Sequence, residues 1–224
     1  MPAAGRRPIP GGIRALLAAN FLNTVAYVGL ITFLGDQVFS ITGRELDLGL
    51  LALAVFVPVF LFSPIGGTVA DRMDRRYVYA AALAVQIGVA ATVFLYGRSD
   101  PDRVWPFFVC MAVYGAARAF AAPASRSMPI DLAPTDVLER VIALKALAFQ
   151  SGVIVGPVMA GFAAVVAVEL PYLISTVLLT VALALLVLVP KAEIERLETP
   201  SGPLQAFADA VDGFRYIRRN PVIL

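Results

Sequence analysis

The chain of 224 residues contains no histidine and a single cysteine, Cys110. The absence of histidine excludes His-bound zinc, His-ligated haem and Ser-His-Asp or Cys-His catalysis within this chain. One cysteine cannot form a disulfide within the chain. Because the apolar runs also hold no paired carboxylates and no metal-ligand cluster, the sequence predicts that the protein is not an enzyme and has neither a cofactor nor a metal site.

Charged residues are scarce as well, at 15% of the chain against 59% hydrophobic residues. A soluble domain does not need a mean hydropathy of +0.82 to fill its core. The apolar runs lack the every-second-residue alternation of barrel strands, and about 20 such residues span a bilayer as a helix. The sequence therefore predicts an all-α integral membrane protein that has the lipid bilayer, and no nucleic acid, as partner. Six transmembrane helices are expected at about 15–35, 48–70, 77–97, 104–125, 140–168 and 170–190.

Arginine and lysine are unevenly distributed between the two sides of this predicted bundle, residues 1–190. Basic residues concentrate on the cytoplasmic side of membrane proteins. The sequence therefore predicts a multi-pass protein of the inner or plasma membrane with both termini cytoplasmic. Residues 191–224 are more polar and predict a cytoplasmic linker with a short amphipathic helix, followed by the start of another apolar segment. The basic side holds Arg6, Arg7, Arg14, Arg72, Arg75, Arg76, Arg126, Arg140 and Lys145, and the other side holds Arg44, Arg98 and Arg103.

A charged hairpin separates the second and third apolar runs. Its spacing resembles the loop signature of the major facilitator superfamily, with Asp74 where that family usually has glycine. The resemblance implies a role in gating, whereas the plainer alternative is a positively charged anchor on the cytoplasmic side. We expect Asp71 to point at the N-terminus of an adjacent helix. The matching residues are Gly67, Asp71, Arg72, Arg75 and Arg76.

A second motif lies in the fifth apolar run, where Gly152, Gly156, Pro157 and Gly161 resemble the antiporter motif of the same family. Ala160 replaces one glycine of that motif. Small residues four positions apart form a flat face on which another helix can pack closely, and proline bends the helix. Close helix packing without a transport role is the alternative interpretation.

The first apolar run carries a polar stripe of Asn20, Asn23, Thr24 and Tyr27, spaced to share one helix face. In lipid such a stripe must face protein or water. The resemblance implies that it lines a substrate cavity, because the first helix borders the central cavity in that family. A seam of hydrogen bonds between helices is the alternative, and the sequence does not separate the two.

Two charged residues bear on transport. Arg118 lies inside the fourth apolar run, where a guanidinium normally faces a partner or a wet cavity. It resembles a helix-four arginine of the family, and the alternative is that it reaches the headgroups. Proton coupling ordinarily uses an intramembrane acid. Asp36, at the outer end of the first run, is the candidate, with an interfacial carboxylate as the alternative.

The resemblance covers the whole chain and implies the N-terminal six-helix half of a twelve-helix fold, natural or truncated. It points to the drug and siderophore exporter branch, which includes enterobactin-exporter-like proteins. The expected function is proton-coupled efflux of a small-molecule substrate by alternating access. We expect both motifs to face a missing C-terminal half or a second copy, so that the chain alone does not transport. Import stays open, and a non-transporting six-helix scaffold or assembly subunit is the alternative.

Overall fold

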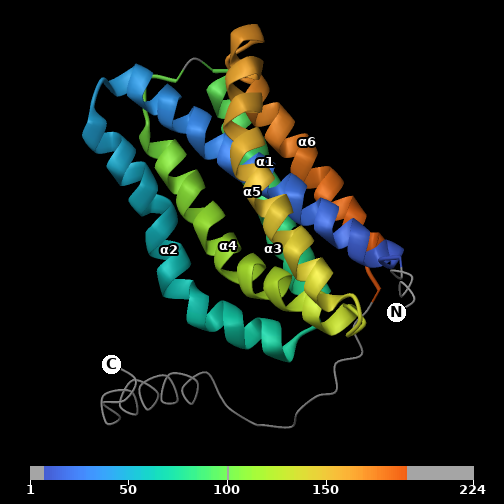
Figure 1. Cartoon of the computed structure of the whole chain (residues 1–224). Helices are drawn as coiled ribbons and strands as arrows, with labels where there is room; N and C mark the ends of the chain where they lie inside the picture. The colour runs from blue at the N-terminus through green and yellow to red at the C-terminus, as the bar shows by residue number, and fades with distance from the viewer. Residues whose placement is uncertain (1–7, 100, 191–224) are drawn as a thin grey trace, which may run out of the picture.

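The computed structural model describes residues 8–99 and 101–190, and the predicted linker at 191–224 lies outside them. The described chain runs up and down as a bundle of long helices (Figure 1). Six of them are long and apolar enough to cross a membrane, which confirms the predicted all-helical class. The helices are α1 (Gly11–Thr42), α2 (Glu45–Arg72), α3 (Arg75–Gly97), α4 (Trp105–Leu132), α5 (Leu138–Val166) and α6 (Leu170–Leu185), followed by the short 3-10 helix η1 (Leu186–Leu188).

The helices α1 and α4 extend past the apolar runs that predicted them. α1 continues to Thr42, and Gly43 ends it in the left-handed conformation with its N–H bonded to the Phe39 carbonyl at 2.7 Å. α4 continues to Leu132 through Pro123 and Pro129. An apolar run counts only residues suited to lipid, whereas a helix can carry its polar last turns into water.

The helices pack as two groups around α1 and α4. α1 contacts chiefly α5 and α6, α4 contacts chiefly α2 and α3, and α3 also contacts α6. The backbones of α2 and α4 approach closely. This is shown by Gly66, where an added Cβ would lie 2.2 Å from the Ala119 carbonyl oxygen. A Cβ on Gly115 would lie 2.3 Å from the Val55 carbonyl oxygen. Only glycine fits at these two contacts.

The helix-five motif forms the contact between α5 and α1. A Cβ on Gly152 would lie 2.9 Å from the Thr24 Cβ, and a Cβ on Gly156 would lie 2.8 Å from the Val25 carbonyl oxygen. The expectation that this motif faces a second half is therefore wrong for both glycines. Four-residue spacing places them on one face of α5. Gly161 lies off that face, is exposed and has no atom within 4 Å of the site of a Cβ.

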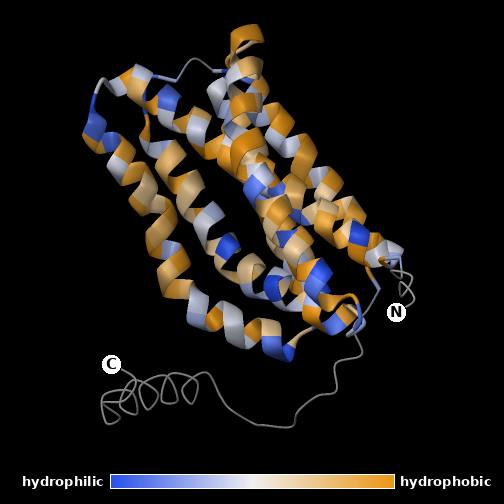
Figure 2. Cartoon of the chain, viewed as in Figure 1, coloured by the Kyte–Doolittle hydropathy of each residue, from blue (hydrophilic) through white to orange (hydrophobic). Residues whose placement is uncertain are grey.

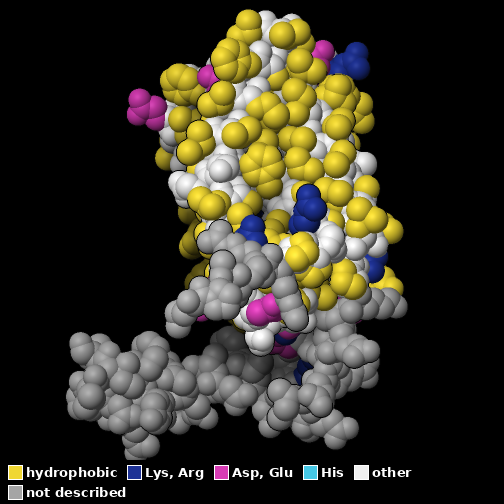
Figure 3. Space-filling model, turned by 45° about the vertical axis from the view of Figure 1, so that its right-hand side comes forward, with side chains coloured by type: hydrophobic (Ala, Val, Ile, Leu, Met, Phe, Trp, Pro, Cys, Tyr) yellow, Lys and Arg dark blue, Asp and Glu magenta, His cyan; other side chains and the backbone are white. Residues whose placement is uncertain are grey.

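The outside of the bundle is largely apolar. Figure 2 shows hydrophobic residues along most of each helix, and Figure 3 shows hydrophobic side chains covering most of one flank. Large side chains on this surface include Phe60 at 68%, Phe162 at 76% and Val165 at 86% exposure. Exposure on this scale would be unfavourable in water, so it indicates a surface covered by lipid or by another apolar bundle.

Candidate functional site

A polar pocket of about 200 Å³ lies between α1, α3, α4 and α5. The outside of the bundle is otherwise largely apolar along the helices. Figure 2 shows hydrophilic positions within the middle turns of the helices. The sequence-predicted residues Asn20, Asn23, Tyr27 and Arg118 all line it. The complete lining is Asn20, Asn23, Thr24, Tyr27, Val28, Tyr79, Gln86, Arg118, Ala121, Ala122, Ser125, Arg126, Lys145 and Phe149.

The α1 stripe both lines this pocket and joins α1 to α3. The Tyr79 hydroxyl donates to Asn20 Oδ1 at 3.2 Å, and Asn23 Nδ2 donates to Gln86 Oε1 at 3.0 Å. The stripe therefore forms hydrogen bonds between helices and also lines a pocket, and a role of this pocket in holding substrate stays a prediction. Neither Tyr79 nor Gln86 was singled out from the sequence as a site residue, and the two lie seven positions apart on one face of α3 with mostly apolar residues between them.

Arg118 projects into the pocket above an aromatic pair. Its guanidinium carbon lies 3.6 Å from the centre of the Tyr27 ring, and this ring stacks on Tyr114 at 5.6 Å between centroids. Tyr114 is fully buried. A cation above a ring face is attracted by the ring quadrupole, an interaction that strengthens away from water. The stack fixes Arg118 at the pocket wall, in contrast to the alternative in which it reaches the headgroups.

Two further cations line the same pocket, Arg126 from α4 and Lys145 from α5. The Lys145 ammonium donates to the backbone carbonyl of Ser125 at 2.5 Å. Sequence reasoning treated both residues as anchors near the membrane edge, and only the packing of α5 against α4 brings Lys145 here. Ser125 was recognisable, because Arg118, Ala121, Ala122 and Ser125 follow the spacing of one helix face.

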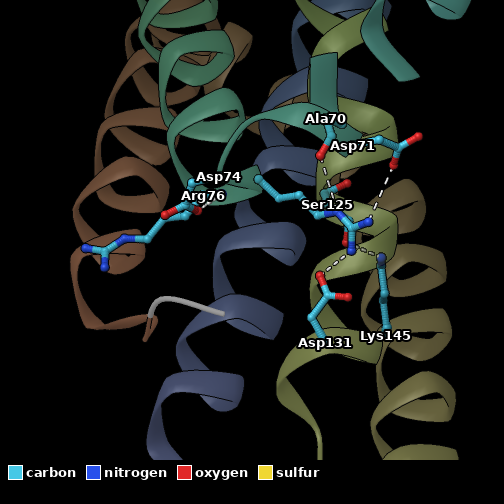
Figure 4. Close-up of polar contacts among 8 residues, drawn as sticks. Ala70, Asp71, Asp74, Arg76, Ser125, Asp131 and Lys145 are labelled. Atoms are coloured by element: carbon cyan, nitrogen blue, oxygen red, sulfur yellow. Dashed lines mark hydrogen bonds and ion pairs between the residues drawn. The ribbon is translucent and has the colours of Figure 1, made fainter. Parts of the chain in front are cut away.

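The hairpin forms a separate network whose centre is Arg75 (Figure 4). The Arg75 guanidinium bonds to Asp131 of α4 through Nη1 and to Asp71 through Nη2, the latter at 3.4 Å. Its Nε lies 3.4 Å from the Ala70 carbonyl oxygen. We expected the electrostatic partners of the hairpin to be absent from the chain. This expectation is wrong for Arg75, at the start of α3, because Asp131 near the end of α4 forms an ion pair with it.

Asp74 begins α3 in place of the usual glycine. Its carboxylate accepts the backbone N–H of Arg76 at 2.9 Å, which is the normal role of an N-cap residue. The Arg76 guanidinium donates to the Val187 carbonyl at 3.1 Å and so ties α3 to η1. Asp71 was expected to point at the N-terminus of an adjacent helix. Its side chain is 73% exposed and pairs with the Arg75 side chain, which belongs to the first residue of α3.

The remaining hairpin positions face outward. Arg72 is exposed. Gly67 has no atom within 4 Å of the site where a Cβ would be, in contrast to the adjacent Gly66. Close approach of another helix within the described bundle therefore uses Gly66, and the motif glycine itself leaves space at the surface.

Asp36 and Asp47, two of the acidic residues near the other end of the bundle, do not line the pocket. Asp36 is exposed and is not among the lining residues. It follows Tyr27 by nine positions on α1, or about 13 Å along the helix axis. Asp47, which sequence reasoning missed, is 5% exposed, and one carboxylate oxygen lies 3.8 Å from Arg44 Nε. That oxygen, Oδ2, has no hydrogen-bond partner among the described residues.

Six apolar helices, four of which line a polar pocket, define a multi-pass membrane protein. A family model, the Major Facilitator Superfamily, matches residues 16–224. The chain belongs to this superfamily.

Individual relatives share the fold over part of their length. YfiS of Bacillus subtilis, an uncharacterised MFS-type transporter, is 23% identical over 216 residues, which are 95% of this chain and 51% of that protein. The quinolone resistance protein NorA of Staphylococcus aureus is 26% identical over 129 residues, which are 56% of this chain and 31% of that protein. The match thus covers about half the length of YfiS and about a third of the length of NorA.

A solved structure of an auto-inhibited POT family peptide transporter superposes with a TM-score of 0.66 at 18% identity. The match covers 85% of this chain and 39% of that one. At this identity the likeness shows the fold alone. It agrees with one six-helix half of the larger transporter.

Proposed function

We propose that the chain forms the N-terminal half of an alternating-access transporter that exports a small molecule, a drug or a siderophore, in exchange for protons. The observation that carries this proposal is the polar pocket around Tyr27 and Arg118. Polar groups inside a membrane bundle are unfavourable unless they bind one another, water or a solute. The likeness to the quinolone resistance protein NorA supports drug export as one of the two substrate classes.

The second half of the pathway is proposed to be another six-helix bundle, either a C-terminal half or a second copy. The outward-facing motif positions support this, because Gly67 and Gly161 leave space at the surface. The exposed apolar side chains of α2 and α5, among them Phe60 and Phe162, suit the same contact. Rocking of two such bundles about a site between them would give alternating access.

Orientation and coupling are part of the proposal. The uneven distribution of arginine and lysine favours both termini in the cytoplasm, with the hairpin on that side of the inner or plasma membrane. Asp36 is the proposed proton-coupling carboxylate, and the buried Asp47 is the competing site in the same part of the bundle.

Reconstitution tests the proposal. The 224-residue chain is placed in liposomes with an imposed pH gradient, with a fluoroquinolone, which carries a carboxylate, as the drug-like probe and a trihydroxamate iron chelator as the siderophore probe. We expect no saturable flux when each vesicle holds one copy. We expect saturable, protonophore-sensitive flux when a second six-helix bundle is present. Flux carried by single copies would contradict the half-transporter proposal.

A non-transporting scaffold is the competing function, and matched substitutions separate it from transport. In the transporter, Arg118→Gln and Asp71→Asn each reduce flux at unchanged protein level. In a scaffold, both variants leave assembly and cellular phenotype intact. Arg140→Gln is the control, because Arg140 is exposed on α5 and does not line the pocket.

A further inference from the structure

We propose that the pocket selects solutes with an anionic group, a carboxylate, phosphate or sulfonate, attached to a small apolar or aromatic body. This inference rests on the proposed transport function and specifies its substrate class. It depends on which charges of this chain the fold brings together at the pocket.

The charge of the pocket lining is of one sign. Arg118, Arg126 and Lys145 line it, and the lining contains no aspartate or glutamate. By contrast, Arg75 pairs with Asp71 and Asp131, and Arg44 pairs with Asp47. Arg118 and Lys145 are partly buried, whereas Arg126 is exposed. No ion pair among the described residues includes any of the three. A partly buried cation without a counter-charge is unfavourable in a membrane protein. A bound anion would supply the missing negative charge.

The hydrogen-bonding groups of the pocket also favour an acceptor. Gln86 is completely buried at the pocket, and its Oε1 already accepts from Asn23. Its Nε2 is left without a partner among the described residues. The free donor therefore has the same requirement as the three cations, an oxygen that accepts hydrogen bonds. An unpaired buried donor is unfavourable by about 1–3 kcal/mol, so an anionic oxygen in reach of it gains affinity.

The other side of the pocket suits an apolar or aromatic body. Val28, Ala121, Ala122 and Phe149 line it beside the Tyr27 ring. Its volume of about 200 Å³ lies below the roughly 300–1,000 Å³ typical of drug-sized sites. This half-site therefore fits a compact group, and the rest of a larger solute would extend out of it.

Equilibrium binding to the purified 224-residue chain in phosphatidylcholine nanodiscs tests the inference without requiring transport. The probes are a naphthalenesulfonate, the uncharged naphthalenesulfonamide and a naphthylmethylammonium, measured by calorimetry. We expect the sulfonate to bind about tenfold more tightly than the sulfonamide, since a charge-assisted hydrogen bond contributes about 1.5–3 kcal/mol. Equal affinity for the three probes, or preference for the cation, would overturn the inference.

Substitutions assign the binding to the pocket. Arg118→Gln and Lys145→Gln should each weaken sulfonate binding about tenfold and leave sulfonamide binding unchanged. Arg140→Gln should alter neither. If Arg118→Gln fails to fold, Lys145→Glu decides, because the new carboxylate should pair with a remaining arginine and remove most of the preference for the sulfonate over the sulfonamide. Equal weakening by Arg140→Gln would show general surface attraction and overturn the inference.

A lipid headgroup offers the same anionic chemistry, so a short-chain phosphatidylglycerol is added as competitor. Weak competition supports a solute site. Displacement of the sulfonate at stoichiometric phosphatidylglycerol would assign the cations to a lipid and overturn the inference.

The failure of the inference differs from failure of the proposed function. Flux of uncharged or cationic probes without sulfonate binding rejects only the anion selectivity, whereas sulfonate binding without flux from any assembled pair rejects only transport.

Discussion

Arg75 and Arg118 lie on adjacent membrane-spanning helices, but their charges are compensated differently. Arg75 contacts two carboxylates and a backbone carbonyl at the hairpin. Arg118 lies over the Tyr27 ring, and none of the salt bridges among the described residues includes it. A fully paired arginine stabilises the fold in which it lies. An arginine without a counter-charge retains the capacity to bind a ligand, so the contrast agrees with a structural role for Arg75 and with the ligand-binding role proposed for Arg118.

The largest expected effect on stability concerns helix packing beside the hairpin. Neighbouring atoms fill the space that a Cβ on Gly66 would need, and no atom lies within 4 Å of a Cβ on Gly67. Gly66→Ala places a Cβ 2.2 Å from the Ala119 carbonyl oxygen and should destabilise the bundle by about 3 kcal/mol or more. Gly67→Ala should be neutral or slightly stabilising, because helix interiors favour alanine. Thermal unfolding in detergent measures both variants. Equal losses would show that α2 and α4 do not approach as described.

The next effect concerns Arg75. Arg75→Gln removes the charge that compensates Asp131, whose side chain is only 23% exposed, and should destabilise the bundle by about 2 kcal/mol. Asp71→Asn should be milder, about 0.5 kcal/mol, since the Asp71 side chain is 73% exposed. A double-mutant cycle of Arg75→Gln with Asp131→Asn measures the coupling. Additive effects would contradict the pairing.

Arg118→Gln should show the opposite pattern. Because no carboxylate is left unpaired, we expect a loss of unfolding free energy below about 1 kcal/mol, mainly the cation–π contact with Tyr27. Flux of the assembled transporter should fall about tenfold. The comparison with Arg75→Gln at matched protein amounts is the informative one. If Arg118→Gln lowers stability as much as Arg75→Gln does, the two arginines play the same structural role.

The smallest expected effect on stability concerns Asp36 and Asp47, two acids at the end of the bundle away from the hairpin. Asp36→Asn should abolish the dependence of flux on the pH gradient and leave probe binding and thermal stability unchanged, because Asp36 is exposed and outside the pocket. Asp47→Asn is the matched substitution at a buried carboxylate. Gradient dependence that survives Asp36→Asn and disappears with Asp47→Asn would move the coupling site to Asp47.

The helices and the α1 stripe could be predicted from sequence because lipid imposes a strong and simple pattern. Continuous apolar runs locate helices, and Asn20, Asn23 and Tyr27 share a face by spacing alone. Lys145 and Asp131 were missed because their roles depend on contacts between distant segments. No local pattern tells that Lys145 meets Ser125 or that Asp131 meets Arg75.

The motif glycines show the same limit. Spacing predicted a flat face on α5, but the sequence does not indicate which helix covers it. The family pattern assigned Gly152 and Gly156 to a contact outside the half, and the structure assigns them to α1. The residues that stay open, Gly67 and Gly161, could be told from them only after the helices were placed.

The central claim is that the pocket around Tyr27 and Arg118 admits solutes from water, and thiol labelling tests it most directly. Cys110→Ala removes the chain's one cysteine, and Ala122→Cys then places a thiol in the pocket lining. Ile154→Cys, at a 61% exposed position in the middle of α5 and outside the pocket lining, is the control. We predict that a membrane-impermeant thiol reagent modifies the chain at position 122 and not at 154, and that a bound naphthalenesulfonate slows this modification. An unreactive thiol at 122, or equal reactivity at both positions, would contradict the account.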